Sequence, residues 1–196
     1  MRIEEWDARY RRRERAEDFS AEATPLLVET VRKLTPGSAL DLACGTGRNA
    51  LWLASQGWSV RAVDGAPAAI EILNASAHDR ALHIQTQVAD LESAEFKIDP
   101  GSWDLVAKCY YLQRSLIPAV KAGVRPGGIA IVIVHLVEPG EQVTYKHATP
   151  GELRDFFADW EMLHYFEGQP RDAAHKRAVA EVVGRRPEAD RLTSRR

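Results

Sequence analysis

Hydrophobic positions along this chain follow two spacings, one typical of helices and one typical of buried strands. In the segment 21–34, apolar side chains recur at helical spacing until Pro36-Gly37 ends the segment. The next segment, 38–43, is short and apolar, which is typical of a strand. The alternation continues, with helices expected at 48–56, 66–77, 115–124 and 151–158 and strands at 58–63, 82–88, 103–109, 129–136, 161–166 and 178–183. This order of elements predicts an α/β fold.

The segment 129–136 is a continuous apolar run rich in β-branched residues. Such a run is typical of a central strand that helices cover on both faces. We therefore expect a doubly wound, mostly parallel, Rossmann-like sheet. The last two strands are expected to form an antiparallel hairpin at the sheet edge, joined by a loop at 167–176.

Composition narrows the classes of protein that fit. The chain has 196 residues, 45% of them hydrophobic, so we expect one domain over 1–196. Its formal charge is only −2, so we expect no nucleic-acid partner. Its apolar runs are far shorter than the ~20 residues of a membrane helix, and the charged N-terminus lacks a signal-peptide core, so a cytoplasmic location is expected. The arginine-rich segments 9–15 and 185–196 are expected to be a solvated helix face and a disordered tail.

The two cysteines, Cys44 and Cys109, lack the spacing of a zinc or redox motif, so no metal is expected. If their strands are neighbours, both thiols lie near the ligand-binding edge of the sheet. We expect them to act there as small apolar residues, and a catalytic thiol or redox switch is the alternative.

The segment 40–50 carries the strongest functional signal. It places Gly45 and Gly47 in a turn between a strand and a helix, which lets a ligand approach the backbone at the carboxyl edge of the sheet. The spacing Gly45-x-Gly47-x-x-Ala50 also satisfies a dinucleotide fingerprint. The turn alone therefore fits either a nicotinamide cofactor or S-adenosylmethionine (SAM).

Acidic residues near the ends of three successive strands favour SAM. Asp64 suits ribose hydroxyls, which both cofactors present, whereas Asp90 is placed to accept a hydrogen bond from an adenine amino group. Asp41 precedes the first glycine by four residues, where it could bind the amino-acid portion of SAM or orient the turn. SAM has no pyrophosphate to place at the helix N-terminus.

The chain resembles the class I SAM-dependent methyltransferases, and more narrowly the small tellurite-resistance TehB-like group. The resemblance rests on Trp6-Asp7-x-Arg9-Tyr10, the segment 40–49, Ala62-Val63-Asp64, Val88-Ala89-Asp90-Leu91, Arg125-Pro126-Gly127-Gly128, Thr149-x-Gly151-Glu152-Leu153 and Trp160-Glu161. It implies seven strands in the order 3-2-1-4-5-7-6, with the seventh antiparallel. The chain departs from the group at Lys108-Cys109-Tyr110-Tyr111, where the group has smaller residues.

The resemblance and the motif together give a set of candidate cofactor-binding residues. These are Asp41, Ala43, Gly45, Gly47, Arg48, Asn49, Asp64, Gly65, Asp90, Leu91, Lys108 and Cys109. The expected reaction is in-line methyl transfer to a small-molecule thiol, amine or metalloid oxyanion. Such a transfer depends mainly on alignment and exclusion of water.

Three residues are catalytic candidates. Tyr10 is expected to cover the cofactor from a lid at 1–20, His135 to accept a substrate proton, and Tyr110 to face the acceptor. A surface tyrosine and a structural histidine remain the alternatives for Tyr10 and His135. Four further residues could supply positive charge for an anionic acceptor: Arg114, Arg171, His175 and Arg177. Residues of these types are more often solvated surface residues, which is the alternative for each.

Two other functions stay open. An NAD(P)-dependent oxidoreductase would use the same glycine turn, but the sequence offers no convincing Tyr-x-x-x-Lys pair and its antiparallel ending argues against that class. A SAM-binding protein without catalytic activity would keep the cofactor site and lack the acceptor site.

Overall fold

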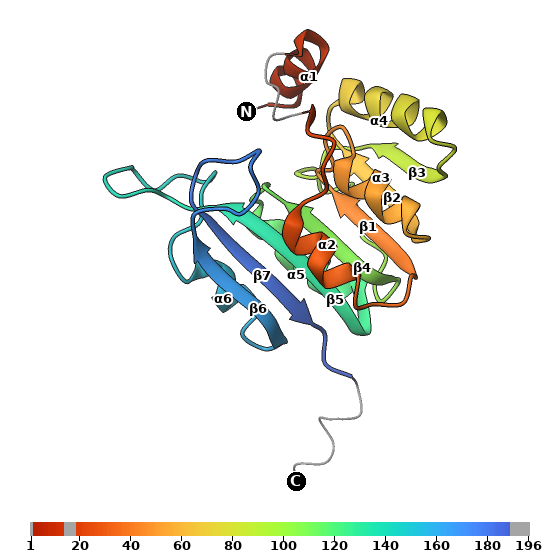
Figure 1. Ribbon diagram of the computed structural model, residues 1–196. Coiled ribbons are helices and arrows are strands. Elements are labelled where there is room, and N and C mark those ends of the chain that lie inside the picture. The colour runs from red at the N-terminus through yellow and green to blue at the C-terminus, as the bar shows by residue number, and fades with distance from the viewer. Residues whose placement is uncertain (1, 14–18, 189–196) are drawn as a thin grey trace.

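Within residues 2–13 and 19–188, which the computed structural model describes, seven strands form one sheet in the order β3-β2-β1-β4-β5-β7-β6 (Figure 1). They are β1 (Ser38–Leu42), β2 (Ser59–Asp64), β3 (Ile84–Val88), β4 (Trp103–Cys109), β5 (Val124–His135), β6 (Glu161–Gly168) and β7 (Val179–Arg185). Neighbouring strands from β3 to β5 are parallel, and β7 is antiparallel to both β5 and β6. The predicted fold class and strand order are confirmed.

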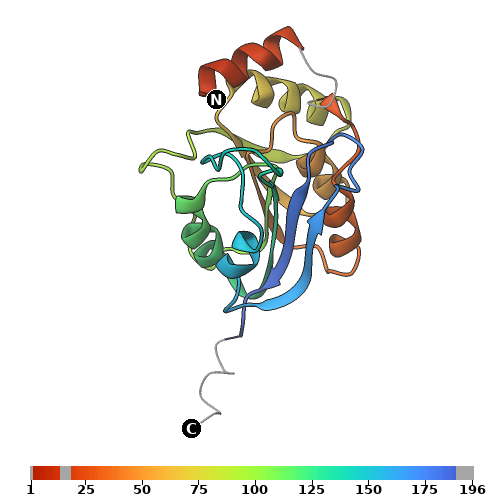
Figure 2. The same cartoon turned by 90° about the vertical axis from the view of Figure 1, so that its left-hand side faces the viewer.

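Helices cover both faces of this sheet (Figure 2). They are α1 (Ile3–Arg12), α2 (Pro25–Val31), α3 (Arg48–Ser55), α4 (Pro67–Asp79), α5 (Ile117–Gly123), preceded by the 3₁₀ turn η2 (Arg114–Leu116), and α6 (Glu152–Phe156). Side chains of α2, α3 and α4 pack in one hydrophobic cluster, and side chains of α5 and of the segment around α6 pack in a second cluster across the sheet. Among the described residues, no helix combines the length and apolar character needed to cross a bilayer.

Two elements differ from their predicted bounds by more than two residues at an end. The helix expected at 21–34 is shorter, because Pro25 occupies its first turn and the chain before Pro25 is not helical. Strand β5 begins at Val124, five residues before the expected start, and it includes the Pro126-Gly127-Gly128 segment that was expected to end a helix. The register explains this, because Trp103 pairs with Val124 and Leu105 with Ile129, so the residues between them bulge out of the ladder.

Helix α1 packs on α4 at the carboxyl edge of the parallel strands (Figure 1). Asp7 Oδ1 accepts a hydrogen bond of 2.7 Å from the Ala68 N–H in the first turn of α4, where a carboxylate also complements the helix dipole. The expectation of a solvated arginine face is wrong for Arg9, which is only 8% exposed and whose guanidinium lies 4.5 Å from the centre of the Trp6 ring. Residues 1, 14–18 and 189–196 of the expected lid and tail lie outside the described residues.

Candidate active site

The glycine turn follows β1 and leads directly into α3. Gly45 and Gly47 have φ angles of +55° and +86°, in the left-handed region that favours glycine. A Cβ added to Gly47 would lie 2.2 Å from a methyl carbon of Leu73 on α4, so this glycine also lets two helices approach closely. Ala43, another predicted cofactor contact, has a φ of +53° just before the turn.

Asp64 at the end of β2 holds the turn in place. Its Oδ2 accepts a 2.8 Å hydrogen bond from the Gly45 N–H, and its Oδ1 accepts a 2.9 Å bond from the Ala66 N–H. Burial raises the pKa of this carboxyl group, whereas these backbone bonds act in the opposite direction. Asp64 therefore fixes the shape of the turn and retains acceptor capacity on both oxygens.

Asp41 lies beneath the turn and is 1% exposed. Its Oδ2 has no hydrogen-bond partner among the residues that the structure describes. Burial, with a further contribution from the charge of Asp64, raises the pKa of Asp41 to about 7, although the charge of Arg48 opposes this shift. A buried carboxylate oxygen without a donor is costly, which is typical of a group whose partner is a ligand.

The N-terminal helix lies over the same turn. The Tyr10 hydroxyl oxygen is 3.0 Å from the position that a Cβ on Gly45 would take, and Ile3 is 2.9 Å from the corresponding position on Gly65. Tyr10 is 8% exposed and stacks on Trp6. The structure therefore places Tyr10 against the glycine turn, and its role as a lid residue stays a prediction.

The predicted adenine side is more open. Asp90 is exposed, and its Oδ1 accepts a 2.8 Å hydrogen bond from the Glu92 N–H. Leu91 is buried, and its carbonyl oxygen accepts a 2.8 Å bond from Gln113 Nε2. Asn49, another predicted cofactor contact, instead uses its side-chain oxygen to accept the Thr24 N–H at 2.9 Å.

Strand β4 ends in buried groups of unusual character. Lys108 is fully buried, its Nζ has no hydrogen-bond partner in the described residues, and the Tyr111 ring centre lies 5.8 Å away. Burial lowers the pKa of Lys108 to about 7. Burial also raises the pKa of Cys109 to about 12 and that of Cys44 well above its usual value. Both cysteines are therefore protonated near neutral pH, which disfavours a catalytic thiolate.

Beyond β4, a set of rings faces the loop between β6 and β7, residues 169–178. Tyr110 stacks on His175 with ring centres 3.4 Å apart, and His135 lies 5.4 Å from Tyr110 and 5.3 Å from His175. Burial lowers the pKa of His135 to about 4, and its Nδ1 has no partner among the described residues. His135 is thus a neutral imidazole at pH 7, with a buried and unpartnered nitrogen. Because the sequence predicts that Tyr110 faces the acceptor, we call these three rings and the 169–178 loop the acceptor side.

The arginines near this edge are bonded to carboxylates. Arg48, a predicted cofactor contact, turns its guanidinium to Asp172 with an Nη2 to Oδ2 distance of 2.6 Å. The other pairs are Arg114 with Glu152, Arg171 with Glu29 and Arg177 with Glu141. Asp172 was missed by sequence reasoning, because an aspartate in a polar loop shows no periodicity and its partner is 124 residues away.

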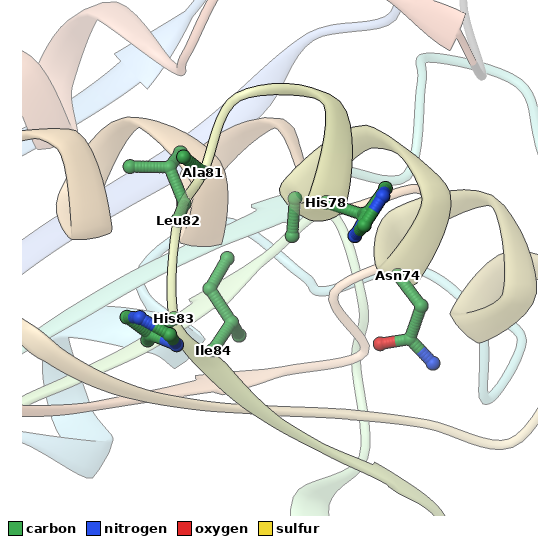
Figure 3. A pocket seen from close by; sticks show the side chains of 7 residues that line it. Asn74, His78, Ala81, Leu82, His83 and Ile84 are labelled. Carbon is green, nitrogen blue, oxygen red and sulfur yellow. The ribbon is translucent and has the colours of Figure 1, made fainter.

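A separate hollow of about 340 Å³ lies between the end of α4 and the start of β3 (Figure 3). Asn74, His78 and His83 contribute its polar groups. The hollow is at the amino-terminal end of β3, the opposite edge of the sheet from the glycine turn. It is therefore separate from the candidate active site.

The strand order, with its antiparallel β7, and the glycine turn followed by Asp64 define the class I methyltransferase fold. The crystal structure of TehB from Haemophilus influenzae matches with a TM-score of 0.73 and 25% identity, over 84% of this chain and 62% of that chain. The family model described as "Tellurite resistance protein TehB" matches residues 18–177. The chain belongs to the TehB family.

Two of the relatives that match in sequence show how much of their length this chain covers. "Hemagglutinin 1" of Eikenella corrodens is 33% identical over 151 residues, which are 71% of this chain and 49% of that protein. A "Probable S-adenosyl-L-methionine-dependent methyltransferase TehB" of Haemophilus influenzae is 25% identical over 151 residues, which are 72% of this chain and 52% of that protein. This chain thus spans about half the length of these relatives.

Proposed function

We propose that this protein is a SAM-dependent methyltransferase that transfers a methyl group to a small-molecule thiol, amine or metalloid oxyanion. The observation that carries the proposal is the unpartnered Oδ2 of Asp41, buried beside the glycine turn. The proposal also draws on the TehB relative, which is named a probable SAM-dependent methyltransferase.

The residues present fit SAM. An ammonium group is the donor that the buried Asp41 carboxylate lacks, and Asp64 keeps free acceptor capacity for hydroxyl groups. Gly45 lets a ligand approach the backbone, and the exposed Asp90 is available to an adenine amino group. The further contacts that we propose come from Ala43, Gly47, Arg48, Asn49, Gly65, Leu91, Lys108 and Cys109, of which Arg48 and Asn49 contribute through the backbone because their side chains are engaged elsewhere.

SAM would supply a methyl group on a positively charged sulfur. The chain's own part is to hold the acceptor in line and to receive its proton. Among the acceptor-side rings, His135 is neutral at pH 7 and its buried Nδ1 has no partner in the described residues, so it is the group that we propose as the proton acceptor. Tyr110 forms the wall beside His135, and Tyr10 excludes water above the turn.

The test is calorimetric titration with S-adenosylhomocysteine and with NADH. We expect micromolar binding of S-adenosylhomocysteine, no binding of NADH, and at least about tenfold weaker binding by Asp41→Asn, which removes the charge and keeps the shape. Asp99→Asn is the matched control, because Asp99 is exposed and precedes β4 at the opposite edge of the sheet.

Methyl release from SAM is then measured with thiol, amine and selenite acceptors. We expect His135→Asn to keep S-adenosylhomocysteine affinity and to lose most methyl release. Preference for NADH would show that the glycine turn serves a dinucleotide instead. Tight S-adenosylhomocysteine binding without methyl release to any acceptor would favour a SAM-binding protein that lacks catalytic activity.

A further inference from the structure

One buried carboxylate joins three distant segments at the active-site edge. Asp172 is 7% exposed and accepts four hydrogen bonds. Arg48 donates Nη1 to Oδ1 at 3.3 Å and Nη2 to Oδ2 at 2.6 Å. The Tyr110 hydroxyl donates to Oδ2 at 2.9 Å, and the Ala174 N–H donates to Oδ1 at 3.0 Å.

The donors come from both halves of the site. Arg48 is the first residue of α3 and directly follows Gly47, so its backbone is continuous with the glycine turn. Tyr110 follows the last residue of β4, and Ala174 belongs to the same loop as Asp172. Asp172 therefore connects the proposed cofactor turn with the acceptor side through its own carboxylate.

The Arg48–Asp172 pair is strongly held. Burial raises the pKa of Asp172, but the hydrogen bonds and charge of Arg48 outweigh burial and leave this pKa below its usual value. Asp172 in turn raises the pKa of Arg48 despite the burial of the guanidinium. Both groups therefore stay charged near neutral pH, and loss of either would leave the other as an uncompensated buried charge.

The same carboxylate also holds Tyr110 in an unusual backbone conformation. Tyr110 has a φ of +62°, which is rare for a bulky residue and is retained only where its surroundings enforce it. Its N–H donates to the Ile133 carbonyl oxygen at 2.7 Å, its hydroxyl is fixed by Asp172, and its ring stacks on His175. A shift of Asp172 would therefore move the ring that stands beside His135.

A second ion pair attaches the same loop elsewhere. Arg171 Nη1 lies 2.9 Å from Glu29 Oε1 on α2, and both side chains are about half exposed, at 48% and 54%. Solvent-exposed pairs of this kind contribute little to stability. Glu29 thus offers a control in which the loop loses an ion pair that has no contact with the glycine turn.

We infer that Asp172 is a positioning residue that couples the glycine turn to the 169–178 loop, so that cofactor binding at the turn orders the acceptor side. The inference rests on the proposed function, because it takes the turn as the cofactor site. It makes acceptor binding follow cofactor binding, since the loop is fixed to the turn through Arg48.

The experiment is hydrogen exchange of the full chain with and without saturating S-adenosylhomocysteine. In the wild type we expect the ligand to slow exchange about tenfold both at residues 43–48 and at 169–178. In Asp172→Asn the ligand should still slow exchange at the turn but leave the loop nearly unchanged. Glu29→Gln should respond as the wild type does, and Asp172→Glu should restore part of the loop response.

Folding of each variant is checked by its thermal unfolding. If Asp172→Asn does not fold, the double variant Arg48→Gln/Asp172→Asn replaces it, because it leaves no unpaired buried charge. The double variant should likewise lose the loop response. The wild-type loop response persisting in either folded variant would overturn the inference. So would a variant in which loop exchange rises by the same factor in the free and in the ligand-bound protein, because the slowing by ligand is then kept and the role of Asp172 is purely structural. Absence of ligand binding by the wild type would overturn the proposed function and this inference together.

Discussion

The two turn glycines differ in what a methyl group would contact. For Gly47→Ala, we expect a loss of about 3 kcal/mol in the free energy of unfolding, because its Cβ would overlap Leu73 in the core. For Gly45→Ala, we expect a loss of about 1 kcal/mol, since only the hydroxyl end of the Tyr10 ring is near, together with much weaker S-adenosylhomocysteine binding. Urea unfolding measures the loss of stability, and calorimetry measures the binding of S-adenosylhomocysteine.

Gly140→Ala is the matched control for these variants. Gly140 also has a positive φ, +85°, but nothing lies within 4 Å of its added Cβ, so it isolates the conformational cost. A Gly47→Ala variant that loses no more stability than Gly140→Ala would contradict the role assigned to Leu73.

Lys108 gives the second prediction at this scale. The folded chain holds the amine neutral above its pKa of about 7, whereas the unfolded chain keeps it protonated up to 10.5, so the folded state is penalised most below pH 7 and recovers as the pH rises. Lys108→Met should therefore raise the free energy of unfolding by about 2 kcal/mol at pH 7, and the gain should shrink towards pH 10. Denaturant unfolding across this pH range checks it. The exposed Lys176→Met should show no such trend, and a gain of equal size at pH 10 would contradict the explanation.

The candidate site residues that could be predicted from the sequence are those that lie at the ends of neighbouring parallel strands. Asp41 and Asp64 could be placed near the glycine turn because the carboxyl ends of parallel strands meet at one edge. The different roles of the two aspartates could not be predicted from the sequence. Only the structure shows that Asp64 accepts a hydrogen bond from the Gly45 N–H and that Asp41 Oδ2 has no partner among the described residues. The partner of Arg48 depends on loop geometry, which has no sequence period.

At the scale of elements, α1 gives a kinetic prediction. Replacing Tyr10 with Ala removes the hydroxyl that lies against Gly45, so S-adenosylhomocysteine should dissociate about tenfold faster, with a smaller effect on association. Stopped-flow fluorescence measures both rates. Glu4→Ala is the control on the exposed side of the same helix. Unchanged dissociation in Tyr10→Ala would remove the lid role from α1.

Element boundaries were predicted less well than element order. The start of β5 was missed because Pro126-Gly127-Gly128 reads as a turn, and only pairing with β4 reveals that the chain bulges there and stays in the sheet. By contrast, the hairpin of β6 and β7 was predicted from two short apolar segments and is confirmed. Local signals thus identify the elements, whereas their ends depend on neighbours that the sequence does not show.

At the scale of the whole molecule, Asp41 makes stability depend on pH. Because its folded pKa is about 7 instead of 3.8, the folded chain binds an extra proton between these values, and the wild type loses stability as the pH rises through this range. Asp41→Asn should raise the free energy of unfolding by about 2 kcal/mol at pH 8 and leave it almost unchanged at pH 4. Thermal unfolding in a pH series tests this, with Asp99→Asn as the exposed control. A larger gain at pH 4 than at pH 8 would contradict the assignment.

The antiparallel β7 has a consequence for how such a protein can acquire new substrates. Because β7 returns beside β5, the connection from β6 opens at the same edge as the glycine turn, and it is a hairpin that can change length without a change in the sheet. A loop grafted from another family member could therefore exchange acceptor preference and leave the cofactor half intact. Such a graft must keep one feature, an acidic side chain that reaches Arg48.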